Sequence, residues 1–172
     1  PESWKVIYKK INHKERQLGL CSAIAATARK ELVQRRGHKI SDNIELPIVV
    51  SNDIESITKT KELKKVLIGL GLGDDIARST ILRKARSGTA RRRGRPARSG
   101  IGALIIVGNG SKLITLSQSI PGVKIKHLKD VGIMDLVPGS KPIRLTIYSH
   151  NAIEGMKSLQ APMHKVLEVM RK

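Results

Sequence analysis

Short apolar runs alternate along the chain with segments of helical periodicity, and this alternation predicts the secondary structure. Residues 46–50 and 103–107 are apolar runs with the length of buried strands, and residues 123–125 form a shorter run of the same kind. Residues 143–148 alternate apolar and polar side chains, which is the period of a strand. The pattern therefore predicts four strands.

The longest helical pattern covers residues 13–36. Asn12 and Glu15 have the spacing of a capping box at its start, and Gly37 is a suitable C-terminal stop. Its predicted inward residues are Leu18, Cys21, Ala25, Leu32 and Val33. Further helices are predicted at 58–70, 74–81, 111–119, 133–136 and 151–159, and the tail 161–172 also has a helical pattern. Asn151 and Glu154 form a second capping-box spacing.

Strands that alternate with helices at this spacing are joined by right-handed crossovers into a parallel sheet. The predicted fold class is α/β, with a three-layer, mainly parallel open sheet flanked by helices in a Rossmann-like arrangement. We expect residues 1–172 to form one domain. Within it, residues 1–11 are a basic, extended lead-in, and residues 83–100 are an arginine-rich insertion loop.

The insertion contains a strongly basic segment, residues 83–98, without an acid or a large apolar side chain. Its eight cations are Arg83, Lys84, Arg86, Arg91, Arg92, Arg93, Arg95 and Arg98. Gly88, Gly94 and Pro96 disfavour both helix and strand, and the like charges repel one another. We therefore expect an extended, mobile segment. The planar guanidinium of arginine suits a phosphate, so the expected partner is a polyanion.

The whole chain shares this charge bias, with 33 Lys and Arg against 14 Asp and Glu and a net charge of +19. No apolar run approaches the roughly eighteen residues of a spanning helix, and no signal peptide opens the chain, so nucleic acid is favoured over a membrane surface. Aromatic residues amount to 2% of the chain, which predicts recognition through phosphate, ribose and shape instead of base stacking. Four more candidate RNA-binding residues come from the lead-in and the start of the long helix: Lys9, Lys10, Lys14 and Arg16.

The sequence contains no convincing catalytic or metal-binding motif. Gly108 and Gly110 follow a strand as in a dinucleotide loop, but Leu113 replaces the third glycine, so an ordinary turn is expected. The five histidines lack metal-binding spacing, and Cys21 is the only cysteine. We therefore expect no catalytic residue, no metal, no cofactor and no small-molecule substrate.

Several runs of the sequence together resemble one family. These runs are residues 11–18, 22–28, 46–53, 84–91, 119–123, 136–139, 144–146 and 151–153. They are similar to large-subunit ribosomal protein number four of the archaeal and eukaryotic cytosolic type, and the resemblance extends over nearly the whole chain. The run at 84–91 resembles the basic insertion of that type.

The resemblance implies an α/β protein of the cytoplasmic large ribosomal subunit that binds ribosomal RNA, contacts neighbouring ribosomal proteins and supports early assembly. It implies no enzymatic activity. It also implies that the family's N-terminal strand and tunnel loop are absent from this chain, so the sheet should lack one strand. From the residues alone, the alternatives are a regulatory protein that binds messenger RNA or DNA, a localisation signal in the basic segment, and an enzyme of phosphate chemistry.

Overall fold

The sheet at the centre of the molecule has four parallel strands. The computed structural model describes residues 2–158 apart from 42, 118 and 142, so the predicted helix at 161–172 and the end of the one at 151–159 lie outside the described residues. The strands are β1 (Ile48–Val50), β4 (Leu104–Val107), β5 (Lys124–His127) and β6 (Thr146–Ser149). Their order is β1-β6-β4-β5, and Ile147 of β6 pairs with Ile48 on one side and Ile105 on the other. The predicted parallel α/β fold is confirmed.

Burial along the strands follows their place in the sheet. Every residue of the central strands β4 and β6 is buried, including Thr146, whose hydroxyl donates to the Arg144 carbonyl at 3.0 Å. The alternation in 143–148 therefore does not mean a solvent-exposed face. In the edge strand β1 only Ile48 is buried, and Val49 is 48% exposed. The prediction of a fully buried strand at 46–50 is wrong because an edge strand is covered less.

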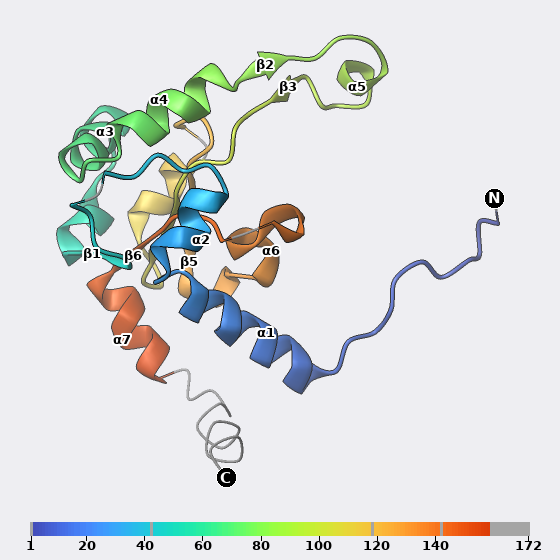
Figure 1. Ribbon diagram of the computed structural model, residues 1–172, viewed down its shortest axis with the longest axis horizontal. Helices are drawn as coiled ribbons and strands as arrows, with labels where there is room; N and C mark the ends of the chain where they lie inside the picture. The colour runs from blue at the N-terminus through green and yellow to red at the C-terminus, as the bar shows by residue number, and fades with distance from the viewer. Residues whose placement is uncertain (1, 42, 118, 142, 159–172) are drawn as a thin grey trace.

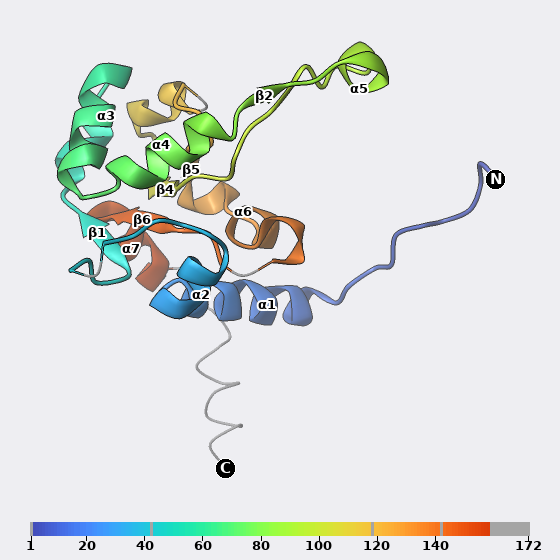
Figure 2. The same ribbon diagram turned by 45° about the horizontal axis from the view of Figure 1, so that its top comes forward.

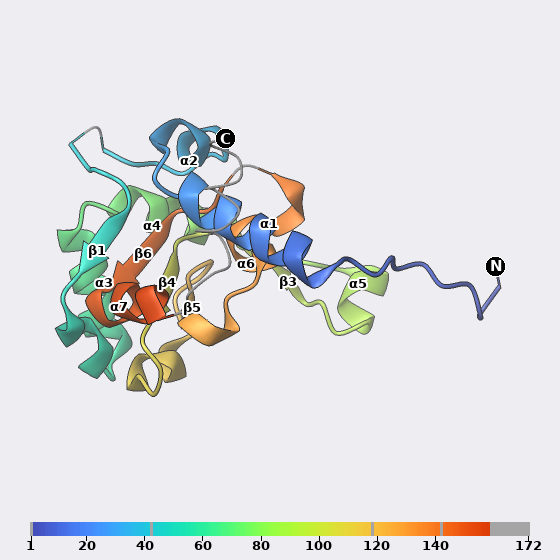
Figure 3. The same cartoon turned by 90° about the horizontal axis from the view of Figure 1, so that it is seen from below.

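Helices cover both faces of the sheet. They are α1 (His13–Ala26), α2 (Lys30–Arg35), α3 (Thr60–Gly69), α4 (Gly73–Ile81), α6 (Ile133–Leu136) and α7 (His150–Ser158). Figure 2 shows α3 and α4 on one side of the sheet and α1 and α2 on the other, and Figure 3 shows α1 and α2 nearest the viewer. Short 3-10 helices lie at Asn52–Ser56 (η1), Lys112–Leu116 (η2), Leu128–Asp130 (η3) and Pro138–Ser140 (η4).

The predicted helix at 13–36 is two helices, because the chain leaves helical geometry at Thr27–Arg29. The buried Thr27 hydroxyl donates to the Ile24 carbonyl at 2.7 Å and accepts from the Tyr148 hydroxyl of β6 at 3.1 Å. Arg29 is then extended, with φ −90° and ψ 107°. A buried tertiary contact therefore ends α1.

The face and the caps of these helices also differ from the prediction. Leu18 and Ala25 are exposed and Ala23 is buried, whereas Val33 is buried as predicted. Asn12 is at the N-cap of α1, but its side chain makes no capping hydrogen bond. Gly37, with φ +97°, follows α2 as predicted.

Two later helices begin differently from the prediction as well. The Ser149 hydroxyl accepts from the Ala152 N–H at 3.2 Å, and the Asn52 amide oxygen accepts from the Asn151 N–H at 2.8 Å. Ser149 therefore caps α7, and the predicted capping box of Asn151 and Glu154 is wrong. The helix predicted at 111–119 is the shorter 3-10 helix η2, after which the Ser117 hydroxyl donates to the Ile125 carbonyl of β5.

The basic segment is a structured hairpin. Strands β2 (Lys84–Ala85) and β3 (Ala97–Arg98) pair antiparallel, and the short helix α5 (Gly88–Arg92) lies between them. Figure 1 shows this hairpin leaving the body beyond α4. The expectation of a segment without regular structure is therefore wrong, and we call residues 83–98 the hairpin from here on.

Glycines pack backbone against backbone where the hairpin joins the sheet. The Gly102 N–H donates to the Gly122 carbonyl at 2.9 Å, and a Cβ on Gly122 would lie 2.6 Å from the Gly100 carbonyl oxygen. Gly122 also has φ +82°. The two atoms nearest to that Cβ would be backbone atoms of Gly100 and Gly102, which cannot rotate away, so this junction requires glycine.

We expect Gly122→Ala to lower the free energy of unfolding by about 3 kcal/mol, because left-handed strain and overlap with the Gly100 carbonyl add together. Gly110→Ala is the matched control, since Gly110 has φ +83° with nothing within 4 Å. It should cost only the strain, about 1 kcal/mol. Urea denaturation measures both, and equal losses would contradict the packing argument.

Candidate nucleic-acid interface

The two strands of the hairpin bring like charges together. Lys84 lies directly opposite Arg98, and the one other pair in the ribbon is Ala85 with Ala97. The Arg86 N–H adds a hydrogen bond to the Pro96 carbonyl at 2.8 Å. Like charges opposite one another destabilise a ribbon, and a two-stranded hairpin is marginal in water. An anion between the strands would relieve this repulsion.

The tip of the hairpin is a short helix with a defined end. The Gly94 N–H donates to the Arg91 carbonyl at 3.2 Å, and the Arg95 N–H donates to the Ala90 carbonyl at 3.0 Å. With φ +72° at Gly94, these bonds form a Schellman motif. Gly94 therefore ends a helix that our sequence analysis missed, and a glycine after a stretch of Thr, Ala and Arg was the available signal.

The structure leaves the predicted RNA-binding cations accessible. Arg86 is half-buried, and the other eleven side chains are exposed. In the part of the chain that the structure describes, none of the twelve forms an ion pair with a carboxylate. The eight hairpin cations are brought together, whereas Lys9, Lys10, Lys14 and Arg16 lie on the lead-in and α1. Figures 1 and 3 show the hairpin and the lead-in as two separate projections from the same side of the body.

The lead-in also carries aromatic side chains. Trp4 is 77% exposed and Tyr8 is 74% exposed, close in sequence to Lys9 and Lys10. Our expectation that the chain has no surface for base stacking therefore applies to the hairpin but not to the lead-in.

The base of the hairpin adds cations that sequence reasoning did not bring together. A pocket of about 410 Å³ is lined by Arg36, Arg78, Lys84, Arg98 and Lys141 among others. Arg36 donates to the Pro138 carbonyl at 2.8 Å, and burial, followed by the charge of Arg78, lowers its pKa. The members come from residues 36–141, so no local pattern could have grouped them.

A buried carboxylate anchors this base. Asp75 of α4 accepts from Arg78 Nε at 3.0 Å and from His38 Nδ1 at 3.0 Å. The His38 Nε2 atom accepts from the Leu145 N–H at 3.2 Å, so the proton of this neutral imidazole is on Nδ1. Arg78 Nη2 also donates to the Ile101 carbonyl at 2.7 Å, where the chain returns from the hairpin. Burial raises the pKa of Asp75, but the hydrogen bonds from His38 and Arg78, together with the charge of Arg78, outweigh burial and lower the pKa overall.

At the carboxyl ends of the strands, opposite the base of the hairpin, the backbone and side-chain donors are taken by the protein's own Glu55 carboxylate. Glu55 accepts from the Gly108 N–H at 2.9 Å, from the Ser149 hydroxyl at 2.6 Å and from the Asn151 amide at 3.3 Å. Ligands of open α/β sheets usually bind at the carboxyl ends of the strands. Because Glu55 takes the Gly108 N–H that a phosphate would need, the predicted ordinary turn at 108–110 agrees with the geometry.

Among the described residues, no three His, Cys, Asp or Glu side chains come together as a metal site would require. Within the same residues, no helix is both long and apolar enough to cross a membrane.

Comparison with known proteins places this geometry in a family context. Residues 1–159 match the sequence profile described as "Ribosomal protein L4/L1 family". The chain is 40% identical over 154 residues to "Large ribosomal subunit protein uL4" of Methanosphaera stadtmanae, covering 90% of this chain and 60% of the relative. It is 38% identical over 157 residues to the protein of the same name from Methanocaldococcus jannaschii, covering 91% and 62%. The chain thus spans about three fifths of the length of these relatives.

Asp75→Asn should destabilise the protein by about 3 kcal/mol, because it removes one partner of a buried ion pair. Asp74→Asn, an exposed neighbour on the same turn of α4, is the matched control and should cost at most about 1 kcal/mol through the helix dipole. Thermal and urea unfolding at neutral pH measure both. A similar loss in the two variants would contradict the anchoring role of Asp75.

The same carboxylate should give the protein a defined acid sensitivity. Because its folded pKa lies below the ordinary 3.8, its contribution is complete above about pH 4 and is lost as the pH falls through the folded value. Unfolding free energy measured between about pH 2 and 6 should therefore fall more steeply for the wild type and Asp74→Asn than for Asp75→Asn. Parallel curves would rule this out.

Proposed function

The chain belongs to the ribosomal protein L4/L1 family, and we propose that it is a structural constituent of the large ribosomal subunit. In this role it binds folded large-subunit ribosomal RNA through phosphate and shape, stabilises that RNA and supports assembly of the subunit. The observation that carries the proposal is the hairpin, which presents eight cations, without an acid, on a projection away from the core. The names of the relatives, which are large-subunit proteins, support the same role.

Phosphate recognition follows from the chemistry of the hairpin. Seven of its eight cations are arginines, whose planar forks can donate two parallel hydrogen bonds to phosphate oxygens. The hairpin has no aromatic residue, so base stacking would fall to Trp4 and Tyr8 of the lead-in. Lys9, Lys10, Lys14 and Arg16 add a second group of phosphate contacts in this proposal.

In this proposal the protein lies in the large subunit of the cytoplasmic ribosome, and its partners are ribosomal RNA and neighbouring large-subunit proteins. The binding reaction requires no cofactor, metal or small-molecule substrate. A regulatory protein that binds messenger RNA or DNA would also need the basic hairpin. Binding experiments that compare ribosomal RNA with other nucleic acids distinguish the two functions.

Affinity for large-subunit ribosomal RNA should depend steeply on salt, because each neutralised phosphate adds roughly −0.7 to −0.9 to the slope of log affinity against log salt. If half of the hairpin cations are engaged, the hairpin alone contributes about −3. Filter binding across a salt series measures the slope, with duplex DNA of similar length as the comparison. A slope near zero, or tighter binding to duplex DNA, would contradict the proposal.

Replacing Arg91, Arg92, Arg93 and Arg95 together by Ala should weaken RNA binding strongly and leave the melting temperature nearly unchanged, because these exposed side chains pack against no core. The matched control replaces Lys59, Lys61, Lys64 and Lys65 by Ala, which removes the same charge from the exposed surface around α3. Calorimetry and filter binding are the two measurements. Lysine at the four arginine positions should give an intermediate affinity, because it keeps the charge but loses the fork. Equal RNA affinity in the two alanine variants would show that only net charge matters.

A further inference from the structure

A second cationic pocket lies at the base of the hairpin, and its floor is the buried side chain of Arg144. Only 3% of Arg144 is exposed. Its Nε donates to the Gly102 carbonyl at 2.6 Å, and its Nη2 donates to the carbonyls of Ala103 at 3.0 Å and Gly122 at 2.7 Å. Arg144 thus braces the amino ends of β4 and β5. Carbonyl oxygens provide hydrogen bonds to its charge but do not neutralise it.

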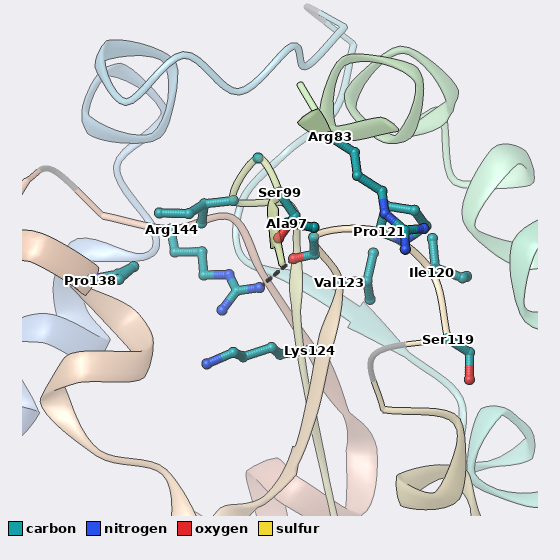
Figure 4. Close-up of a pocket in the computed structure, with 13 residues that line it drawn as sticks. Arg83, Ala97, Ser99, Ser119, Ile120, Pro121, Val123, Lys124, Pro138 and Arg144 are labelled. Carbon is teal, nitrogen blue, oxygen red and sulfur yellow. Dashed lines mark hydrogen bonds between the residues drawn. The ribbon is translucent and has the colours of Figure 1, made fainter. Parts of the chain in front are cut away.

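The third nitrogen of this guanidinium, Nη1, is not used by these hydrogen bonds. Arg144 Nη1 donates to none of the described residues, and no buried polar side-chain atom among them lacks a partner, so Nη1 must face open space. That space is a pocket of about 460 Å³. Figure 4 shows the guanidinium pointing into it, with Lys124 nearby and Arg83 across the opening. The hydroxyl-bearing residues Ser99 and Ser119 also line the wall.

The charge of the pocket is not cancelled by the acid beside it. The acid that acts most strongly on Arg144 is Asp135, and its carboxylate accepts from Lys126 Nζ at 2.8 Å and from the Gly132 N–H at 3.1 Å. Lys124 Nζ lies 4.0 Å from it, at the limit of an ion pair. Burial lowers the pKa of Arg144 to about 10, against the opposing effect of Asp135, so the guanidinium is still charged at neutral pH. Three cations, Arg83, Lys124 and Arg144, therefore line the pocket, and Asp135 beside it is already paired with Lys126.

We propose that the pocket lined by Arg144, Lys124 and Arg83 is a phosphate site that takes a backbone phosphate of the bound RNA. The inference rests on the proposed function and adds a specific subsite to it. Arg83 directly precedes β2, and Ala97 and Ser99 lie at the end of the hairpin and just beyond it, so the pocket opens at the hairpin base. An RNA strand that follows the hairpin arginines inward reaches the mouth of the pocket whose floor is Arg144. There Nη1 can donate to the phosphate, because the Nε and Nη2 groups of the same guanidinium are already held by backbone carbonyls.

Side-chain nitrogen NMR of the wild-type chain tests the site directly. The Arg144 Nε–H, which is buried against the Gly102 carbonyl, should give a protected signal that shifts when inorganic phosphate is added. Lys124→Glu should abolish that shift, whereas Lys64→Glu on α3, which changes the charge equally outside the pocket, should keep it. A ribosomal RNA fragment recovered by ultraviolet crosslinking to the hairpin should shift the same signal and prevent any further response to phosphate.

Filter binding supplies the second measurement. Lys124→Glu should make the salt slope for ribosomal RNA shallower than that of Lys64→Glu by about 0.8, the contribution of one phosphate. If neither phosphate nor RNA shifts the Arg144 signal, the site does not exist. If phosphate still binds in the RNA complex, or if the two slopes agree, the pocket takes a free anion or a carboxylate of another protein, and the RNA assignment is overturned. If the wild type does not bind ribosomal RNA at all, the proposed function itself fails.

Discussion

The buried hydrogen-bonded pair of Asp75 and His38 connects parts of the chain that lie far apart in the sequence. Through His38 it reaches the Leu145 N–H at the start of β6, and through Arg78 it reaches the Ile101 carbonyl, where the hairpin returns to the sheet. The hairpin contributes no apolar surface of its own. Its orientation on the body therefore depends on this polar network and on the glycine contacts next to it.

Charge is divided between the inside and the outside of the molecule. With 33 cations and 14 acids, the chain has few carboxylates, and three of them stabilise the fold. Glu55, Asp75 and Asp135 each accept several hydrogen bonds, and each has a pKa below its ordinary value because these bonds outweigh burial. Among the described residues, none of the eight hairpin cations forms an ion pair with a carboxylate, so they can bind an anion without loosening the core. Arg144 differs from them, since it both braces the sheet and faces a pocket.

The parts of the fold that could be predicted are those determined by local pattern. Three apolar runs and the alternation at 143–148 located all four strands of the sheet, and the pattern at 133–136 gave α6 with its observed ends. The break after α1 depends on the contact of Thr27 with Tyr148, which lies 121 residues away, and no local signal reveals it. The hairpin was missed for a different reason. Its glycines were interpreted as breakers, although positive φ at Gly88 and Gly94 is what lets the chain turn into and out of α5. The eight hairpin cations lie in one short segment and are easily seen. Tertiary structure alone brings Arg36, Arg78 and Lys141 to one pocket and Lys124 and Arg144 to the other.

The position of the aromatic residues has a consequence for spectroscopy. The chain has one tryptophan, Trp4, and it lies exposed in the lead-in, while Tyr148 is the aromatic residue buried in the core. Tryptophan emission will therefore already resemble that of a solvated indole in the folded protein, and it will change little when the sheet unfolds. The same property makes Trp4 an intrinsic reporter of whatever covers the lead-in. Changes in its emission report contacts of that segment, and the state of the core must be followed through Tyr148 or circular dichroism.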